Sequence, residues 1–222
     1  NLQINNPYIT IAGQTAPGDG IMIRNNPLVI TTHDVIVRGL RIRSGRPYSS
    51  SASNDLFQDL QILNYNSTSA SPYNVIIDHC SFTWASGKNV TLWYSPHDVT
   101  LSWNLIAEPL MASSNVNDGR GLLLGGSDGG NMSYYNVSVH HNVLASNPDR
   151  SPLIKPDSSS TQTGVEFVNN LIYNWYWNAT KAQARANIIG NYYIRGPQTA
   201  SGSMAIYIEF LSYLSGNKER GG

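Results

Sequence analysis

Charged residues are scarce in this chain, and several of them fall at the ends of short apolar segments. Lys, Arg, Asp and Glu make up 13% of the 222 residues, against roughly 25% in an average globular protein. Five of them follow or precede alternating apolar runs, namely Asp59, Lys88, Arg120, Arg150 and Lys155. Isolated charges in such places are ordinarily solvated surface. A column of Lys and Arg with a carboxylate, in a chain with so few charges, instead favours an acidic ligand.

The overall composition excludes other classes of partner. The formal net charge is zero, and no basic face is evident, which argues against a nucleic-acid partner. No stretch of about 18 apolar residues is present, so no membrane partner is expected. Cys80 is the single cysteine, which excludes a disulfide framework or a zinc-ligand spacing. Because Cys80 lies in an apolar run, we expect it to be a small buried hydrophobe.

A repeated pattern indicates how these residues are positioned. A turn residue followed by an alternating apolar segment recurs, with copies that start at residues 35, 75, 99, 137, 165 and 186. Successive starts are 40, 24, 38, 28 and 21 residues apart. A β-helix coil of three short strands needs about 20 to 25 residues, so the longer gaps fit a coil with an inserted loop. The repeat predicts an all-β fold, a single-stranded right-handed parallel β-helix that forms one domain over residues 1–222.

A second set of apolar segments lies between these copies and starts near residues 59, 89, 121, 151 and 181. Stacked coils would place its strands side by side, about 4.8 Å apart, so that the five charged residues share one flank. Inserted loops are expected at 44–58, 64–73, 108–119 and 126–134. The first and third of these precede strands of the second set, and we expect them to wall a groove over that sheet.

Asparagines also repeat. Four of them fall five residues after the start of their copy, namely Asn104, Asn142, Asn170 and Asn191. In a solenoid they would form one hydrogen-bonded column, which Leu40 and Cys80 precede in the earlier coils. A β-sandwich is less well supported, because Asp-Gly turn signals occur only in expected loops. The segment from Met204 to Leu214 fits either a further strand or a short helix.

Glycosylation signals suggest a secreted, extracellular glycoprotein. Five Asn-x-Ser/Thr sequons occur, at Asn66, Asn89, Asn131, Asn136 and Asn178. No signal peptide is evident, and the chain opens as though already inside a fold. We therefore expect a mature or trimmed portion of a longer protein.

Several segments resemble the pectate lyase family of polysaccharide lyases, which are parallel β-helix proteins. The most specific are Ile77-Asp78-His79-Cys80-Ser81 and His140-His141-Asn142, followed by Arg150-Ser151-Pro152. The resemblance covers most of residues 7 to 195. It implies secretion and cleavage of pectate (polygalacturonate, the acidic form of pectin) by β-elimination, with calcium as cofactor.

The resemblance also implies a role for each charged residue. Arg150 matches the catalytic arginine, which removes the C5 proton of a galacturonate. Lys155 and Arg120 match substrate-binding cations, and Asp59 matches a calcium-binding aspartate. Such groups are needed because removal of the C5 proton builds negative charge on the neighbouring carboxylate, and cations must neutralise it. An arginine acts as a base only where nearby cations disfavour its charged form.

The chain departs from the family's pattern after Asp59. Gly87 and Thr91 fall where further acidic calcium ligands are expected, and Lys88 adds a positive charge beside them. Calcium prefers six to eight oxygen ligands with several carboxylates. Either the substrate's carboxylates complete the site, or Lys88 replaces the metal and binds substrate, or activity is lost. A glycan on Asn89 would lie close to the groove.

Three hypotheses follow. The first is a secreted lyase that cleaves pectate or a related polyuronate. The second is a catalytically inactive β-helix that binds cell-wall polysaccharide or self-associates. The third, a glycoside hydrolase, is disfavoured because no paired carboxylates occur on neighbouring strands. Asp78-His79 is expected to be structural, Glu108 is an alternative calcium ligand, and the adjacent His140 and His141 are expected to face opposite sides and not to chelate one ion.

Overall fold

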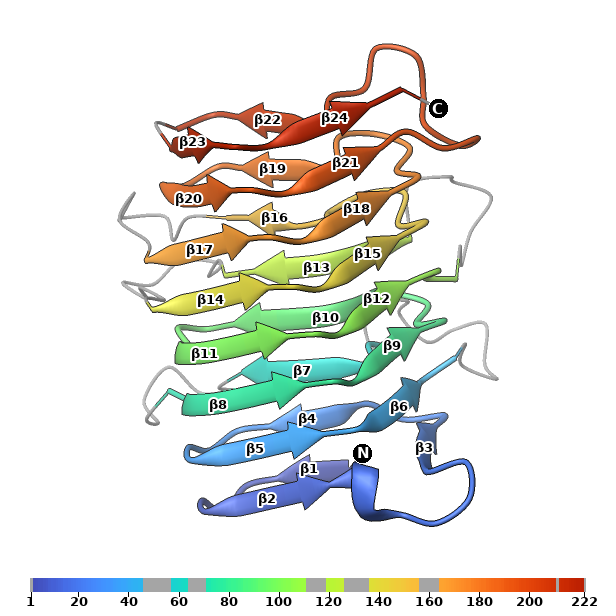
Figure 1. The fold of residues 1–222 in the computed structure, drawn as a ribbon. Helices are drawn as coiled ribbons and strands as arrows, with labels where there is room; N and C mark the ends of the chain where they lie inside the picture. Colours follow the sequence, from blue (N-terminus) through green and yellow to red (C-terminus); the bar gives the residue numbers. More distant parts are fainter. Residues whose placement is uncertain are drawn as a thin grey trace.

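The computed structural model is a solenoid of stacked coils (Figure 1). It describes residues 2–45, 57–63, 71–110, 119–125, 136–155, 164–210 and 212–221. Three parallel sheets of eight strands, here called sheets A, B and C, run along it. The chain visits A, B and C in that order in every coil, which confirms the predicted parallel β-helix.

The strands are short, and each pairs with its counterpart in the neighbouring coils. Sheet A contains β1 (Leu2–Ile4), β4 (Leu28–Ile30), β7 (Leu60–Leu63), β10 (Lys88–Trp93), β13 (Arg120–Leu124), β16 (Leu153–Ile154), β19 (Thr180–Ala182) and β22 (Ile206–Ile208). Sheet B contains β2 (Ile9–Ala12), β5 (Val35–Arg38), β8 (Tyr73–Asp78), β11 (His97–Ser102), β14 (Val137–His140), β17 (Val165–Val168), β20 (Ala186–Ile189) and β23 (Tyr213–Ser215). Sheet C contains β3 (Ile21–Arg24), β6 (Leu40–Arg43), β9 (Ser81–Thr83), β12 (Leu105–Ala107), β15 (Val143–Ala145), β18 (Leu171–Tyr173), β21 (Tyr192–Ile194) and β24 (Lys218–Arg220). Among the described residues, one 3-10 turn, Gly13–Thr15, follows β2.

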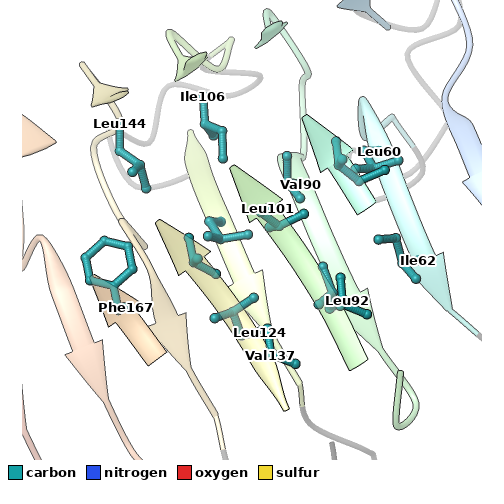
Figure 2. Packing of buried hydrophobic residues seen from close by; sticks show 14 of the residues in the cluster. Leu60, Ile62, Val90, Leu92, Leu101, Ile106, Leu124, Val137, Leu144 and Phe167 are labelled. Carbon is teal, nitrogen blue, oxygen red and sulfur yellow. The ribbon is translucent and has the colours of Figure 1, made fainter. Parts of the chain in front are cut away.

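The core is a continuous column of apolar side chains inside the coils (Figure 2). In-register pairing repeats each inward position from coil to coil, as in the row Leu60, Val90 and Leu122 of sheet A. These side chains are fully buried. Each contributes roughly 1.5 to 3 kcal/mol relative to exposure, so the interior holds the coils together.

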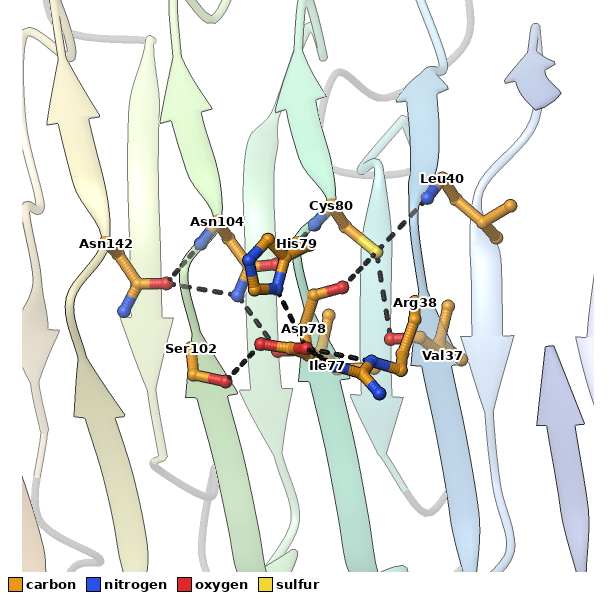
Figure 3. A network of polar contacts seen from close by, with 10 residues as sticks. All are labelled: Val37, Arg38, Leu40, Ile77, Asp78, His79, Cys80, Ser102, Asn104 and Asn142. Atoms are coloured by element: carbon orange, nitrogen blue, oxygen red, sulfur yellow. Dashed lines mark hydrogen bonds and ion pairs between the residues drawn. The ribbon is translucent and has the colours of Figure 1, made fainter. Parts of the chain in front are cut away.

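The turn between sheets B and C carries the predicted asparagine ladder. The Asn142 Oδ1 atom accepts hydrogen bonds from the Asn104 backbone N–H, at 2.9 Å, and from Asn104 Nδ2, at 3.0 Å. Asn142, Asn170 and Asn191 repeat this arrangement toward the C-terminal coil, where Asn217 adds a rung that the sequence did not predict. At the other end the Cys80 N–H donates to Asn104 Oδ1 (Figure 3).

The turn needs a left-handed residue before each rung, because the chain bends sharply there. His79, Trp103, His141 and Asn169 occupy this position with φ between 51° and 57°. The ladder compensates this cost by pairing buried polar groups that the bend would otherwise leave unsatisfied.

Both sets of repeated segments found in the sequence are strands. The first set forms sheet B and the second forms sheet A, whereas the strands of sheet C were not predicted as a set. The segment from Met204 to Leu214 contains β22 and the start of β23, which decides for strand over helix. Most of the predicted loops lie outside the described residues, so their place along the groove stays a prediction.

Replacement of Asn142 by Ala should destabilise the fold. The change removes the acceptor of the buried Asn104 backbone N–H and of one Asn104 Nδ2 hydrogen bond. It also removes the bonds that Asn142 Nδ2 donates to the Leu101 carbonyl and to Asn170. We expect a loss of about 3 kcal/mol, which corresponds to a drop in Tm of roughly 10 °C for a chain of this size. Thermal unfolding monitored by circular dichroism measures the change in Tm. Asn187→Ala, at an exposed asparagine of β20, is the matched control and should unfold near the parent temperature.

Candidate active site

The outer face of sheet A carries a groove of about 590 Å³. Its lining includes five cationic side chains, Lys88, Arg120, Arg150, Lys155 and Lys181. The only carboxylate among the described lining residues is that of Asp149. An excess of fixed positive charge in a hollow of this size suits a ligand that carries several negative charges.

Strand register brings these residues together. Lys88 of β10 pairs with Arg120 of β13. The backbone of Arg120 also forms an isolated parallel β-bridge with that of Asp149. Leu153 of β16 pairs with Leu123 on one side and with Lys181 of β19 on the other. Residues up to 93 positions apart in the sequence therefore lie on four successive coils. The structure thus brings Lys88, Arg120, Arg150 and Lys155 to one flank, as their sequence pattern predicted.

Backbone pairing fixes the position of Arg150. The Leu122 N–H donates to the Arg150 carbonyl at 2.7 Å, and the Gly121 N–H donates to the Asp149 carbonyl at 3.0 Å. A Cβ atom at residue 121 would lie 2.8 Å from the Arg150 oxygen, so only glycine permits this approach. The segment is thus held against β13, where Arg150 lines the groove.

The side chain of Arg150 has a carboxylate beside it. Asp149 Oδ2 lies 3.3 Å from Arg150 Nε, and the two side chains are 28% and 22% exposed. The pair offsets part of the positive charge of the groove. The pair also restricts the orientation of the guanidinium group, because its Nε atom faces Asp149.

Asp59 does not lie in the groove, contrary to its predicted place in the charged column. Its side chain is fully buried, and its Oδ1 atom accepts hydrogen bonds from the Ser44 N–H at 2.7 Å and the Ser44 hydroxyl at 2.8 Å. Since Leu60 pairs with Val90, the residue opposite Lys88 is Gln58, and Gln58 lines the groove. Asp59 occupies the bend just before β7, where strand alternation does not apply, and its side chain turns inward.

Burial changes the chemistry of the Asp59 carboxyl. Loss of hydration raises its pKa to about 8, although the hydrogen bonds from Ser44 and the charge of Arg43 act in the opposite direction. Its Oδ2 atom has no hydrogen-bond partner among the described residues. A carboxyl in this state is protonated at neutral pH.

The described residues do not fit a calcium ion. Calcium needs several carboxylate oxygens, whereas the groove offers one carboxylate among five cations. Thr91 lines the groove and has no charge, and Asp59 faces the interior. No cluster of three or more His, Cys, Asp or Glu side chains suited to a metal occurs in the part of the chain that the structure describes. Glu108 accepts a hydrogen bond from Trp84 Nε1 and is absent from the groove lining.

Lys181 was not predicted as a site residue. It lines the groove one coil beyond Arg150. Its segment had been recognised as a strand of the second set, so strand alternation applied to that segment would have placed it on the outer face. Aromatic rings accompany the lysines: Lys155 Nζ lies 5.6 Å from the centroid of Trp93, and Lys181 Nζ lies 5.4 Å from that of Tyr207. Such contacts stabilise an ammonium group beside other cations.

The prediction of a glycan on Asn89 is wrong for the folded chain. Asn89 is fully buried, and its Nδ2 atom donates to the Ala107 carbonyl at 2.9 Å, which leaves no space for a sugar. Asn136 is exposed and Asn178 is partly exposed, so glycans on these two stay predictions. Asn66 and Asn131 lie outside the described residues.

The histidine motifs lie on the turn between sheets B and C. Asp78 forms an ion pair with Arg38 at 2.7 Å and accepts a hydrogen bond from Ser102, and its Oδ2 atom lies 2.9 Å from His79 Nδ1, which fits the expected structural role (Figure 3). The expectation that His140 and His141 face opposite sides is wrong, because their Nδ1 atoms are 2.9 Å apart. His141 has a left-handed backbone (φ 57°), which breaks strand alternation.

Comparison with known proteins gives the family. No protein-family model matches the sequence. Proteins named probable pectate lyase C from Aspergillus flavus and Aspergillus fumigatus are 34% identical over 200 residues, and that from Emericella nidulans is 32% identical over 196. The chain is a pectate lyase homologue. This confirms the resemblance that the sequence motifs indicated.

The match covers 86% of this chain and about 40% of the length of these relatives. This chain therefore corresponds to only a part of each relative. Within the described residues, no helix is long and apolar enough to cross a bilayer.

The buried carboxyl of Asp59 predicts a specific pH dependence of stability. Its folded pKa lies above its ordinary value, so between about pH 4 and pH 8 the folded state holds a proton that the unfolded state has lost. Stability should therefore fall as the pH rises through this window. In Asp59→Asn this fall should be smaller, since the amide does not titrate. Thermal unfolding at several pH values measures it, with Asp19→Asn, at an exposed aspartate, as control. Parallel curves for the parent chain and Asp59→Asn would contradict the prediction.

Proposed function

We propose that this chain is the catalytic part of a secreted lyase that cleaves pectate or a related polyuronate by β-elimination. The observation that carries the proposal is the groove on sheet A, where Arg150 lies among four further cations. The names of the relatives, probable pectate lyase C, support the same substrate class. A groove with one described carboxylate does not suit hydrolysis by paired carboxylates.

The proposed reaction uses the cations in two ways. Arg150, in its neutral form, takes the C5 proton, and the resulting charge spreads onto the uronate carboxylate. Lys155, Arg120 and Lys88 bind the carboxylates of the chain and stabilise that charge, which is usually the largest contribution to catalysis. The electron pair then forms the C4–C5 double bond, the C4–O bond breaks, and the leaving oxygen takes a proton from water. The neighbouring cations favour loss of the proton from Arg150 beforehand.

An inactive polysaccharide-binding β-helix is the second candidate. Asp149, 3.3 Å from Arg150 Nε, favours it, because a carboxylate stabilises the charged guanidinium that cannot act as a base. Such a protein would bind polygalacturonate through the same cations and release no product.

Replacement of Arg150 by Ala separates the two candidates. In a lyase the change removes the base, and the rate should fall by about 10²- to 10⁴-fold. The product is an unsaturated uronide, so ultraviolet absorbance during incubation with polygalacturonate measures the rate. Arg185→Ala, at an arginine of the sheet B face, is the control and should retain activity. A parent chain that binds the polymer but yields no absorbance would decide for the second candidate.

Chelation tests the role of calcium. Since the described groove residues supply fixed cations and do not fit a calcium site, we expect product formation to persist when a chelator replaces added calcium. Lys88→Ala should lower the rate about tenfold under both conditions, because it removes a charge that offsets the developing carboxylate charge. Activity that disappears with the chelator and returns with calcium would contradict this prediction.

A further inference from the structure

The groove continues past Arg150 to the coil of β19. Lys181 pairs with Leu153 of β16 on one side and with Tyr207 of β22 on the other. Its side chain is 32% exposed and lines the groove. The row of cations therefore extends by one coil spacing, about 4.8 Å, beyond the residues assigned to the reaction.

A carboxylate of the chain itself already contacts Lys181. Glu209 Oε1 lies 3.0 Å from Lys181 Nζ, and Glu209 Oε2 accepts a hydrogen bond from Gln183 at 2.8 Å. The hydrogen bond from Lys181 also lowers the pKa of Glu209, so the carboxylate is ionised at neutral pH. An acidic ligand that reaches Lys181 meets a competitor of the same charge.

We propose that Lys181 and Glu209 form the last subsite of the groove, in which Lys181 binds a uronate carboxylate and Glu209 competes for the same ammonium group. This inference rests on the proposed function, since it names a further specificity-determining residue of the same groove. The Tyr207 ring, 5.4 Å from Lys181 Nζ, keeps the ammonium near the sheet whichever carboxylate it contacts. The competition makes the subsite selective for a ligand carboxylate and unfavourable for a methyl ester, which cannot displace Glu209.

Two substitutions should act in opposite directions. Lys181→Ala removes the cation and should weaken binding of an unesterified oligogalacturonate about fivefold. Glu209→Gln removes the competitor and should strengthen binding two- to fivefold, roughly the effect of one partly exposed ion pair. Titration calorimetry in an Arg150→Ala background, which prevents turnover, measures both dissociation constants.

Matched controls exist on another sheet. Glu219 of β24, in sheet C, forms an ion pair with Arg195, with 2.9 Å between Glu219 Oε1 and Arg195 Nη1. Lys218 is an exposed lysine of the same strand. Glu219→Gln and Lys218→Ala should leave the dissociation constant unchanged. With a methyl-esterified oligomer, all five proteins should bind with similar strength, which a merely structural role of Lys181 would not produce.

The possible failures are distinguishable. Equal dissociation constants for the Arg150→Ala parent, Lys181→Ala and Glu209→Gln would overturn the subsite and leave the lyase proposal intact. A weakening by both substitutions would also overturn it, because the competition would be absent. If the protein bound no oligogalacturonate at all, the proposed function would fall together with the subsite.

Discussion

Parallel, in-register stacking of the coils is the constraint on which the rest of the structure depends. Because each strand pairs with its counterpart one coil away, any position of the repeat recurs about every 4.8 Å along the solenoid. Inward positions merge into one apolar column, and the turn asparagines merge into one ladder. The same rule gathers the cations of sheet A into a groove, although Lys88 and Lys181 are distant in the sequence.

Such stacking makes the position of a single residue decisive. Just before β7, Gln58 lines the groove and Asp59 faces the interior, so a shift of one residue exchanges a groove residue for a buried carboxyl. Asn89 lies beside Asp59 in the next coil and is also buried, with its amide donating to the Ala107 carbonyl. A carboxylate, or a glycosylation sequon, is evident from residue type alone, whereas the side to which it turns at the start of a strand depends on the local path of the backbone.

The sequence predicted the solenoid, sheets A and B and most of the asparagine ladder, because those features repeat with one residue type per coil. It did not predict sheet C as a separate set, because most strands of sheet C start directly after the short turn that ends a sheet B strand, and the two read as one apolar segment. It also failed at His140 and His141, because a left-handed residue in the turn breaks the alternation on which the expectation relied. Local backbone geometry of this kind has no simple signal in residue type.

Electrostatics explains why the groove needs its own counter-charges. Five cations on neighbouring strands repel one another, and the cost is reduced by Asp149 beside Arg150, Glu209 beside Lys181 and the aromatic rings near two lysines. An acidic polymer that enters would take over that neutralisation. The positive charge is covalently attached to the coils, so its amount does not depend on the concentration of a free ion. A groove that relied on bound calcium would instead carry acidic side chains, which repel the polymer whenever the metal is absent. The described lining of this groove is mainly cationic and attracts the polymer without a metal.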